Sequence, residues 1–245
     1  MEQITSLQNK RVKEWCSLHQ KKYRDQTGRF LVEGEHLIKE ALTAGLLEEL
    51  ITDTETPFDF KKVTLVTPQI MAKISKNVSA VHLIGVCRKM EETAERRNRF
   101  ILLDGIQDPG NLGTLIRTAV SFGFDAVYCS EDTCDLFNEK AVRSTQGALF
   151  HIPIMRRNLK DLIPLLQKEG FAVISTSLEE SHTPSQIAVT DQMAFVFGNE
   201  GQGVRKEIQA MSDDRLRIEI TGFESLNVAV AGGIVMYLYR GRETE

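Results

Sequence analysis

The chain has 245 residues, of which 42% are hydrophobic, and a formal net charge of −4 at pH 7. These values are typical of a soluble globular protein with one large or two modest domains, and the overall charge does not indicate nucleic-acid binding. The cysteines form no C-x-x-C pair and have no histidine at ligand spacing, which argues against a zinc site or a disulfide framework and favours a cytoplasmic protein without a metal: Cys16, Cys87, Cys129 and Cys134.

Two segments bear on targeting and membrane insertion. The first ten residues are polar, so we expect no signal peptide. The longest apolar run, residues 226–239, is shorter than the roughly 20 residues that a membrane-spanning helix needs. We therefore expect a buried helix there.

The first part of the chain alternates predicted helices and strands, which indicates a small α/β domain. We expect helices at residues 5–23, 34–44 and from Pro68 onward, and strands at 30–32, 46–52, 63–66 and 81–86. Residues 90–99 are charged and contain few apolar side chains, which is typical of a linker or an exposed helix. We therefore predict one domain at residues 1–96 and a second at residues 97–245.

The alternation continues more strongly in the second part. We expect strands at residues 100–103, 126–129, 152–155, 171–176, 194–197 and 216–220. Helices are expected at 111–122, 138–147, 158–168, 204–211 and 227–239. Continuous apolar strands separated by helices predict an α/β fold with a mostly parallel sheet covered on both faces.

Polar residues follow the first strand of this second part. Residues 104–117 read DGIQDPGNLGTLIR, in which Pro109 and Gly110 favour a turn and Asn111 stands where a helix N-cap is expected. Arg117 follows six residues later, beside the apolar stripe of the predicted helix. The arrangement fits a site at the carboxyl end of a strand, and it also fits an ordinary connection with a capping asparagine and a solvated arginine.

Two other strand ends carry small and polar residues. Residues 195–203, FVFGNEGQG, run into a glycine-rich turn, where glycine lets the backbone approach a ligand closely. This turn lacks the Lys-Ser/Thr ending of a phosphate loop and does not match G-x-G-x-x-G. In residues 218–227, Ser225 and Asn227 precede the last helix, and Ser225 could equally be its N-cap. Three such strand ends in one sheet predict a functional site.

Together these stretches resemble the three motifs of the SpoU-type RNA ribose 2′-O-methyltransferases, in the SPOUT class of S-adenosylmethionine-dependent enzymes. The residues that match the motifs are Asn111, Gly113 and Arg117; Gly198, Glu200, Gly201 and Gly203; and Ser225, Leu226, Asn227 and Val228. Further similarity lies at Arg143, Ser144, Gly147, Ala148 and Pro153, so that the resemblance covers residues 100–242. Residues 30–34 resemble the ribosomal-protein-like RNA-binding domain that precedes the catalytic domain in many members.

The resemblance implies a fold and a cofactor that the residue pattern alone does not indicate. It implies a C-terminal segment threaded into a trefoil knot, which is very rare among proteins, and a homodimer with its active sites near the subunit interface. It also implies that S-adenosylmethionine binds mainly to backbone groups near Thr176, Gly198, Asn199, Glu200, Gly201, Ile218, Ile220 and Leu226. Glycines and apolar strand ends suit an adenine ring, which favours an apolar slot with backbone hydrogen-bonding edges.

The resemblance also assigns the catalytic residues. A ribose hydroxyl must lose its proton as the methyl group is attacked, and Arg117 is the family's candidate for the central role. Because arginine stays protonated, we favour stabilisation of the developing alkoxide and phosphate binding over a role as general base. Residues expected to orient Arg117 and the ribose are Asn111, Glu200, Ser225 and Asn227.

The RNA partner is predicted from the N-terminal domain. Basic residues cluster near the start of the chain, and together with one residue of the second domain they are the expected RNA contacts: Lys10, Arg11, Lys13, Lys21, Lys22, Arg24 and Arg143. The cluster could equally be a solvated helix face. We expect ribosomal RNA to be the substrate, because family members that act on transfer RNA commonly lack this domain. The alternatives are a tRNA ribose methyltransferase and a non-catalytic RNA-binding member of the fold.

Overall fold

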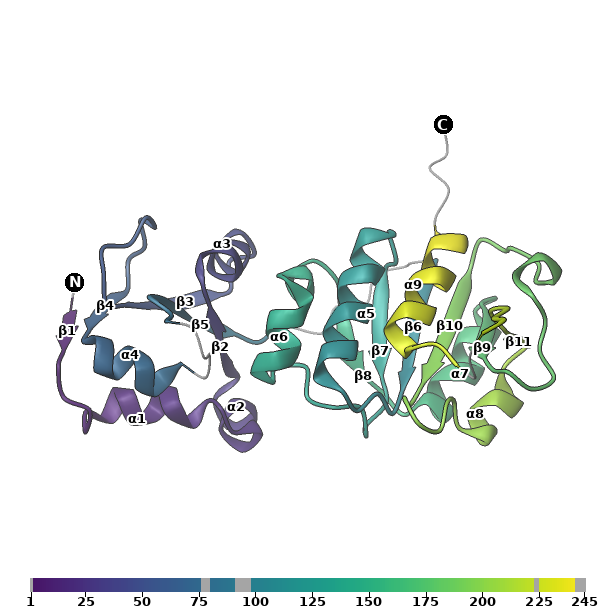
Figure 1. Cartoon of the computed structure of the whole chain (residues 1–245), viewed down its shortest axis with the longest axis horizontal. Helices are drawn as coiled ribbons and strands as arrows, with labels where there is room; N and C mark the ends of the chain where they lie inside the picture. The colour runs from purple at the N-terminus through teal and green to yellow at the C-terminus, as the bar shows by residue number, and fades with distance from the viewer. Residues whose placement is uncertain (1, 76–79, 91–97, 223–224, 241–245) are drawn as a thin grey trace. The chain divides into compact units, whose positions relative to one another are not determined.

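The computed structural model describes residues 2–75, 80–90, 98–222 and 225–240. The chain folds as two units, drawn in Figure 1: Met1–Glu91 with Asp135–Phe150, and Glu92–Cys134 with His151–Glu245. The linker expected at residues 90–99 falls mostly on residues 91–97, which lie outside the described residues. The sequence-based division assigned residues 135–150 to the second domain, whereas their contacts group them with the first unit.

The first unit is built on a five-stranded mixed sheet in the order β1-β4-β3-β5-β2. Strand β5 is antiparallel to β2 and β3, and β4 is parallel to β1 and β3. The strands are β1 (Glu2–Ile4), β2 (Arg29–Glu33), β3 (Leu47–Thr52), β4 (Val63–Val66) and β5 (Leu83–Arg88). The helices are α1 (Lys10–Ser17), α2 (Lys21–Thr27), α3 (Glu35–Thr43), α4 (Pro68–Ile74), α6 (Glu139–Thr145) and the 3₁₀ turn η1 (Ala148–Phe150).

The predicted helix at residues 5–23 is wrong, because the chain forms two helices there. Val12 and Trp15 of α1 are buried in a core shared with α4 and the sheet, as the apolar spacing indicates. The helix ends at Ser17, however, and the Leu18 carbonyl accepts a hydrogen bond of 2.7 Å from Nη1 of Arg24. This side-chain contact takes a carbonyl that a continuous helix would have used for its backbone ladder.

Residues 135–150 complete the core of the first unit. The Phe137 ring lies 4.7 Å from the Phe30 ring, and the Phe150 ring lies 6.2 Å from it on centroid distances. Asp135 forms an ion pair with Arg24, whose side chain is only 5% exposed. Sequence periodicity carries no signal for this grouping, because these contacts join residues more than a hundred positions apart.

The second unit contains a six-stranded sheet in the order β11-β9-β10-β6-β7-β8, with every pair of neighbouring strands parallel. The strands are β6 (Arg99–Asp104), β7 (Ala126–Cys129), β8 (Ile154–Arg156), β9 (Ala172–Thr176), β10 (Met193–Gly198) and β11 (Asp214–Leu216). The helices are α5 (Pro109–Ser121), α7 (Leu159–Lys168), α8 (Lys206–Met211), α9 (Val228–Leu238) and the 3₁₀ turn η2 (Pro184–Gln186). The prediction of an α/β fold with a mostly parallel sheet is confirmed.

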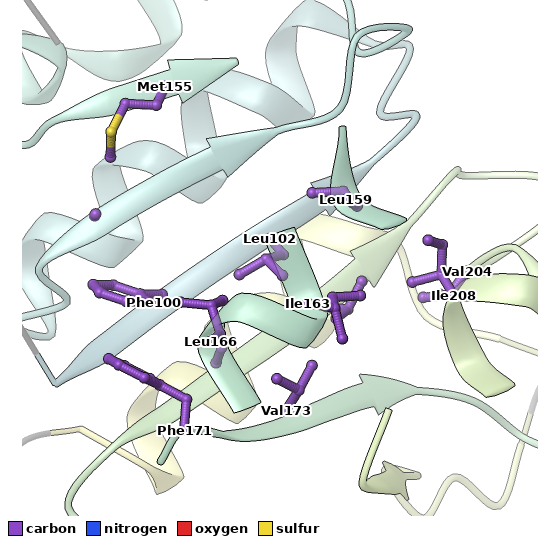
Figure 2. Packing of buried hydrophobic residues seen from close by; sticks show 13 residues of the cluster. Phe100, Leu102, Met155, Leu159, Ile163, Leu166, Phe171, Val173, Val204 and Ile208 are labelled. Atoms are coloured by element: carbon purple, nitrogen blue, oxygen red, sulfur yellow. The ribbon is translucent and has the colours of Figure 1, made fainter. Parts of the chain in front are cut away.

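Helices cover both faces of this sheet because its strands are apolar on both sides. Figure 2 shows Leu159, Ile163 and Leu166 of α7 against Phe100 and Leu102 of β6, in a cluster that also includes a residue of α8. Phe195 of β10 packs on the opposite side, 4.8 Å from the Tyr239 ring at the end of α9. Alternate residues of one strand therefore pack against the helices on opposite faces of the sheet.

Helices α5 and α9 pack directly on each other. Their approach depends on Gly232, because a Cβ there would lie 2.3 Å from Cδ2 of Leu115. The expectation that residues 226–239 form a buried helix is only partly met: α9 is a helix, but one of its faces is exposed. The exposed apolar residues of this segment are Leu226, Val230, Ile234, Tyr237 and Leu238.

The strand expected at residues 216–220 is wrong over most of its length. Strand β11 pairs with β9 from Asp214 to Leu216, and the chain then leaves the sheet. Within the described part of the chain, no helix has the length and apolar character required to cross a membrane.

Candidate active site

The first two stretches that the sequence singled out lie side by side at the carboxyl edge of the second sheet. Strands β6 and β10 are parallel neighbours, and Asp104 at the end of β6 is paired in register with Gly198 at the end of β10. The segments that follow both strands therefore leave the sheet at the same edge. In parallel α/β sheets this edge is where ligands bind.

Glu200 connects these two segments. Its carboxylate accepts hydrogen bonds from the backbone N–H groups of Gln107 at 3.1 Å and Asp108 at 3.0 Å, and from Nδ2 of Asn111 at 3.0 Å. Partial burial raises the pKa of Glu200, but these hydrogen bonds outweigh it and hold the pKa below its usual value. Glu200 is therefore ionised at neutral pH.

Asn111 extends the connection to the third stretch. Its Oδ1 accepts a hydrogen bond of 3.1 Å from Nδ2 of Asn227. The Oδ1 of Asn227 in turn caps α9 by accepting the backbone N–H groups of Ala229 at 2.9 Å and Val230 at 3.3 Å. Glu200, Asn111 and Asn227 thus form one hydrogen-bonded chain that joins all three stretches.

The helix caps differ from those that the sequence suggested. Asp108, not Asn111, is the N-cap of α5, and its side chain accepts the Asn111 N–H at 3.0 Å. Asn227, not Ser225, is the N-cap of α9. Asp108 precedes Pro109, a residue suited to the first helical turn, and this was the available signal for the correct cap.

Arg117 does not join this hydrogen-bonded chain. It lies on the exposed side of α5, and its guanidinium has no hydrogen-bond or ion-pair partner among the residues that the structure describes. It also lies outside the wall of the cavity described next. Its charge is consequently free to meet a ligand.

A cavity of about 400 Å³ lies beside the chain Glu200–Asn111–Asn227. All eight residues expected near the cofactor line it, although they come from four separate segments: Thr176, Gly198, Asn199, Glu200, Gly201, Ile218, Ile220 and Leu226. Ser225 lines it as well. Arg217, Ile218 and Ile220 reach the cavity because the chain has left the sheet after β11.

Several residues of the cavity wall were missed by the sequence reasoning. They are Leu178 and Glu179 after β9, Lys206 and Gln209 of α8, and Arg217 after β11. Each lies within four residues of a strand end or a glycine-rich turn already identified as important, except Gln209. Proximity to the strand ends and to the turn was therefore the available signal for all of them except Gln209, which required the fold.

The glycine-rich turn after β10 has little freedom to change shape. A Cβ on Gly198 would lie 2.0 Å from the backbone nitrogen of Val204, so no larger residue fits. Asn199 closes the turn, because its Oδ1 accepts the N–H groups of Gly201 at 2.9 Å and Gln202 at 3.1 Å. The turn is thus held by its own hydrogen bonds in a single compact form.

The cations expected to contact RNA divide into two groups in the first unit. Five are exposed: Lys10, Lys13, Lys21, Lys22 and Arg143. Arg24 is instead buried in its ion pair with Asp135, so its guanidinium is not presented to RNA. Arg11 is mostly buried and is engaged by Glu2, Glu49 and Thr64. Among the described residues, no group of three or more metal-ligating side chains is placed to hold an ion.

Comparison with known proteins agrees with this geometry. Residues 98–237 match the SpoU rRNA Methylase family, and residues 9–85 match the MRM3-like substrate binding domain. A 23S rRNA (guanosine(2553)-2′-O)-methyltransferase, RlmP of Bacillus subtilis, is 40% identical over 98% of this chain and all of its own length. A 23S rRNA (guanosine-2′-O-)-methyltransferase, RlmB of Escherichia coli, is 35% identical over 56% of this chain and 58% of its own length.

Solved structures give the same assignment over nearly the whole chain. The AdoMet-bound rRNA methyltransferase from Sinorhizobium meliloti superposes with a TM-score of 0.88 at 30% identity, covering 97% of each chain. The motif residues, the cavity beside them and these similarities agree. The chain belongs to the SpoU rRNA methylase family and carries an MRM3-like substrate binding domain before its methylase domain.

Proposed function

We propose that the protein transfers a methyl group from S-adenosylmethionine to a ribose 2′-hydroxyl in ribosomal RNA. The observation that carries the proposal is the convergence on one cavity of the segments that follow β9, β10 and β11, with Glu200 of its wall hydrogen-bonded to Asn111, and Asn111 to Asn227. The reaction is inferred from family membership, and this cavity is the site that we propose for it.

The cavity suits the cofactor in size and lining. Its volume of about 400 Å³ falls in the range of small-molecule sites. Apolar side chains at Ile218, Ile220 and Leu226 face it together with backbone from the glycine-rich turn, a combination that suits an adenine ring and its hydrogen-bonding edges. When bound, S-adenosylmethionine supplies an electrophilic methyl group on a positively charged sulfur.

The hydrogen-bonded chain sets the direction in which the amide groups point. Ionised Glu200 can only accept, so the Nδ2 of Asn111 must face it and the Oδ1 of Asn111 must face Asn227. Each amide nitrogen then keeps one N–H that is not used in the chain. These two donors would hold the ribose hydroxyl, assisted by Ser225, which lines the cavity wall.

Glu200 is a poor proton acceptor in this arrangement, because its pKa is lowered by the donors that surround it. Arg117 stabilises the alkoxide that develops on the ribose and binds a neighbouring phosphate, since its charge is not used by any described residue. Catalysis on this proposal depends on orientation and charge stabilisation, and the departing proton passes to solvent.

The substrate that we propose is 23S rRNA, at the guanosine corresponding to position 2553 of the Bacillus subtilis relative. Identity of 40% along the full chain supports this target over others in the family. Exposed cations on the first unit, such as Lys13, Lys21 and Lys22, would contact RNA phosphates.

The test is transfer of labelled methyl groups to total RNA from a strain lacking the protein, followed by separation of ribosomal and transfer RNA. We expect label in 23S rRNA as an alkali-resistant dinucleotide that contains the target guanosine. Label confined to transfer RNA would identify the tRNA alternative. Cofactor binding by the pure protein without transfer to naked RNA or to ribosomal precursors would favour the non-catalytic alternative.

The exposed apolar face of α9 supports a homodimer. Val230 and Tyr237 are 53% and 52% exposed, and Ile234 lies on the same helix. Contiguous exposed apolar side chains on a soluble protein mark an interaction surface. We expect a dimer by size-exclusion chromatography with light scattering, and a monomer for Ile234→Glu. A wild-type monomer at micromolar concentration would contradict this part of the proposal.

Family membership also supports two properties of the proposal that concern the whole chain. One is a trefoil knot formed by the C-terminal segment, and the other is a cytoplasmic location, where rRNA is modified. An experimental structure with an unthreaded C-terminal segment would contradict the first. Recovery of the protein outside the cytoplasmic fraction would contradict the second.

A further inference from the structure

Strand β6 ends in a carboxylate that is completely buried. The side chain of Asp104 is 0% exposed, and its carboxylate accepts hydrogen bonds from the backbone nitrogen of Arg205 at 2.9 Å and from Nε of Arg205 at 2.8 Å. Nη2 of Arg205 completes an ion pair with the same carboxylate. A buried carboxylate is strongly destabilising unless a cation and hydrogen-bond donors satisfy it. Asp104 therefore requires Arg205 at this position.

Arg205 lies inside the segment that forms one wall of the proposed cofactor cavity. Val204 before it and Lys206 after it line the cavity, whereas Arg205 itself does not. Gly198 lies so close to this segment that a Cβ there would be 2.0 Å from the Val204 nitrogen. Because the backbone is in direct contact, movement of residues 204–206 would displace the end of β10 as well.

A second contact ties the other end of the turn to the same strand end. Nδ2 of Asn199 donates to the carbonyl of Gly105 at 2.9 Å, next to Asp104 in the sequence. The Oδ1 of Asn199 is used within the turn, as described above. The cofactor wall is thus attached to residues 104–105 at two points, one polar and one ionic.

We propose that Arg205 is a positioning residue for the cofactor, which acts by pairing with Asp104 to hold residues 198–206 in the form that accepts S-adenosylmethionine. The inference rests on the proposed function, since it assumes that this cavity binds that cofactor. Arg205 does not contact the cofactor itself. Its effect is on cofactor affinity, not on the methyl-transfer step.

The test measures binding of S-adenosylmethionine and S-adenosylhomocysteine to the full-length protein by isothermal titration calorimetry, and steady-state turnover on RNA. In Arg205→Ala we expect the Kd for both ligands to rise by at least about tenfold, since a buried carboxylate loses its partner. Arg205→Lys keeps the charge but loses the Nε contact, so its Kd should lie between those of the wild-type protein and Arg205→Ala. At saturating cofactor, kcat should stay within about threefold of wild type, because only binding has changed.

Lys160→Ala is the matched control. Lys160 of α7 pairs with Glu207 of α8 at 2.9 Å, two residues after Arg205, but both side chains are 49% exposed and neither lines the cavity. Its removal should leave cofactor affinity unchanged. A comparable loss of affinity in Lys160→Ala would mean that any disturbance of α8 has this effect, and would overturn the specific role of Arg205.

The outcomes separate the inference from the function on which it rests. A folded Arg205→Ala protein with wild-type cofactor Kd overturns the inference, and so does a loss of kcat at unchanged KM for the cofactor. If Arg205→Ala does not fold, Arg205→Lys decides: a raised Kd supports the role and a wild-type Kd rejects it. Failure of the wild-type protein to bind either ligand contradicts the proposed function, and the inference with it.

Discussion

Arg24 of the first unit and Arg117 of the second use their charges in different ways. In the first unit, Arg24 is buried against Asp135 and Arg11 is held by Glu2 and Glu49. Both guanidinium charges are therefore paired with carboxylates within the folded unit. In the second unit, Arg117 is exposed and its guanidinium has no partner among the described residues, six residues along the chain from Asn111, which is held by Glu200. From the sequence we predicted RNA contacts for these arginines of the first unit and a catalytic role for Arg117. Burial and pairing, not residue type, distinguish a residue that stabilises the fold from one that meets a ligand.

The largest effect should come from the arginine that is free. We expect Arg117→Ala to lower kcat by about 100-fold or more, the typical loss when a group that stabilises developing charge is removed. Cofactor affinity should be unchanged, because Arg117 does not line the cavity. Single-turnover methylation and calorimetry would measure the two quantities. Near-normal turnover would remove Arg117 from the mechanism.

The buried arginine should behave in the opposite way. Arg24→Ala should lower the free energy of unfolding by about 3 kcal/mol, because it leaves the mostly buried carboxylate of Asp135 without its partner. Urea denaturation would measure this change, with exposed Lys22→Ala as a control of similar charge that should be neutral. If Arg24→Ala kept its stability and lost only RNA affinity, the distinction between Arg24 and Arg117 would fail.

Substitution of Glu200, which begins the hydrogen-bonded chain Glu200–Asn111–Asn227, should have an intermediate effect. Gln at this position would place an amide donor against backbone N–H groups, so we expect Glu200→Gln to lower turnover by about tenfold. The folded-state pKa of Glu200 is below its ordinary value, so its contribution to stability is present above the unfolded pKa. That contribution is lost as the pH falls through the lower, folded-state pKa.

The corresponding measurement compares thermal unfolding of wild type and Glu200→Gln across pH. Any stability advantage of the wild-type protein at pH 7 should shrink as the pH falls below about 4.3, the ordinary pKa of glutamate. A difference that stays constant down to pH 3 would show that the Glu200 carboxylate is not held in its charged form by the fold.

The smallest effect should come from single exposed cations of the first unit. Lys22→Ala should weaken RNA binding by about twofold to threefold and reduce the slope of log affinity against log salt by about 1, as expected for one phosphate contact. Filter binding at several salt concentrations would measure both. No change in slope for Lys13→Ala, Lys21→Ala and Lys22→Ala together would place the RNA elsewhere on the molecule.

Much of the second unit could be predicted because its signals are local. Apolar runs such as residues 100–103 and 194–197 become strands buried on both faces, and parallel strands bring their carboxyl ends to one edge. The residues after those strands therefore had to meet. The errors fell where contacts that apolar periodicity does not encode decided the structure: Arg24 donates to the Leu18 carbonyl just after α1 ends, and residues 135–150 pack with the first unit.

The amino-acid sequence by itself determined the alternation of strands and helices, the strand ends that carry the motif residues, and the family to which they belong. Only the tertiary structure decided which charges are available to a ligand and which are not. Arg205 and Asp104 are 101 positions apart, and Arg24 and Asp135 are 111 apart. A pairing over such a distance depends on the register of strands and the packing of helices between the two residues, and these are properties of the whole fold.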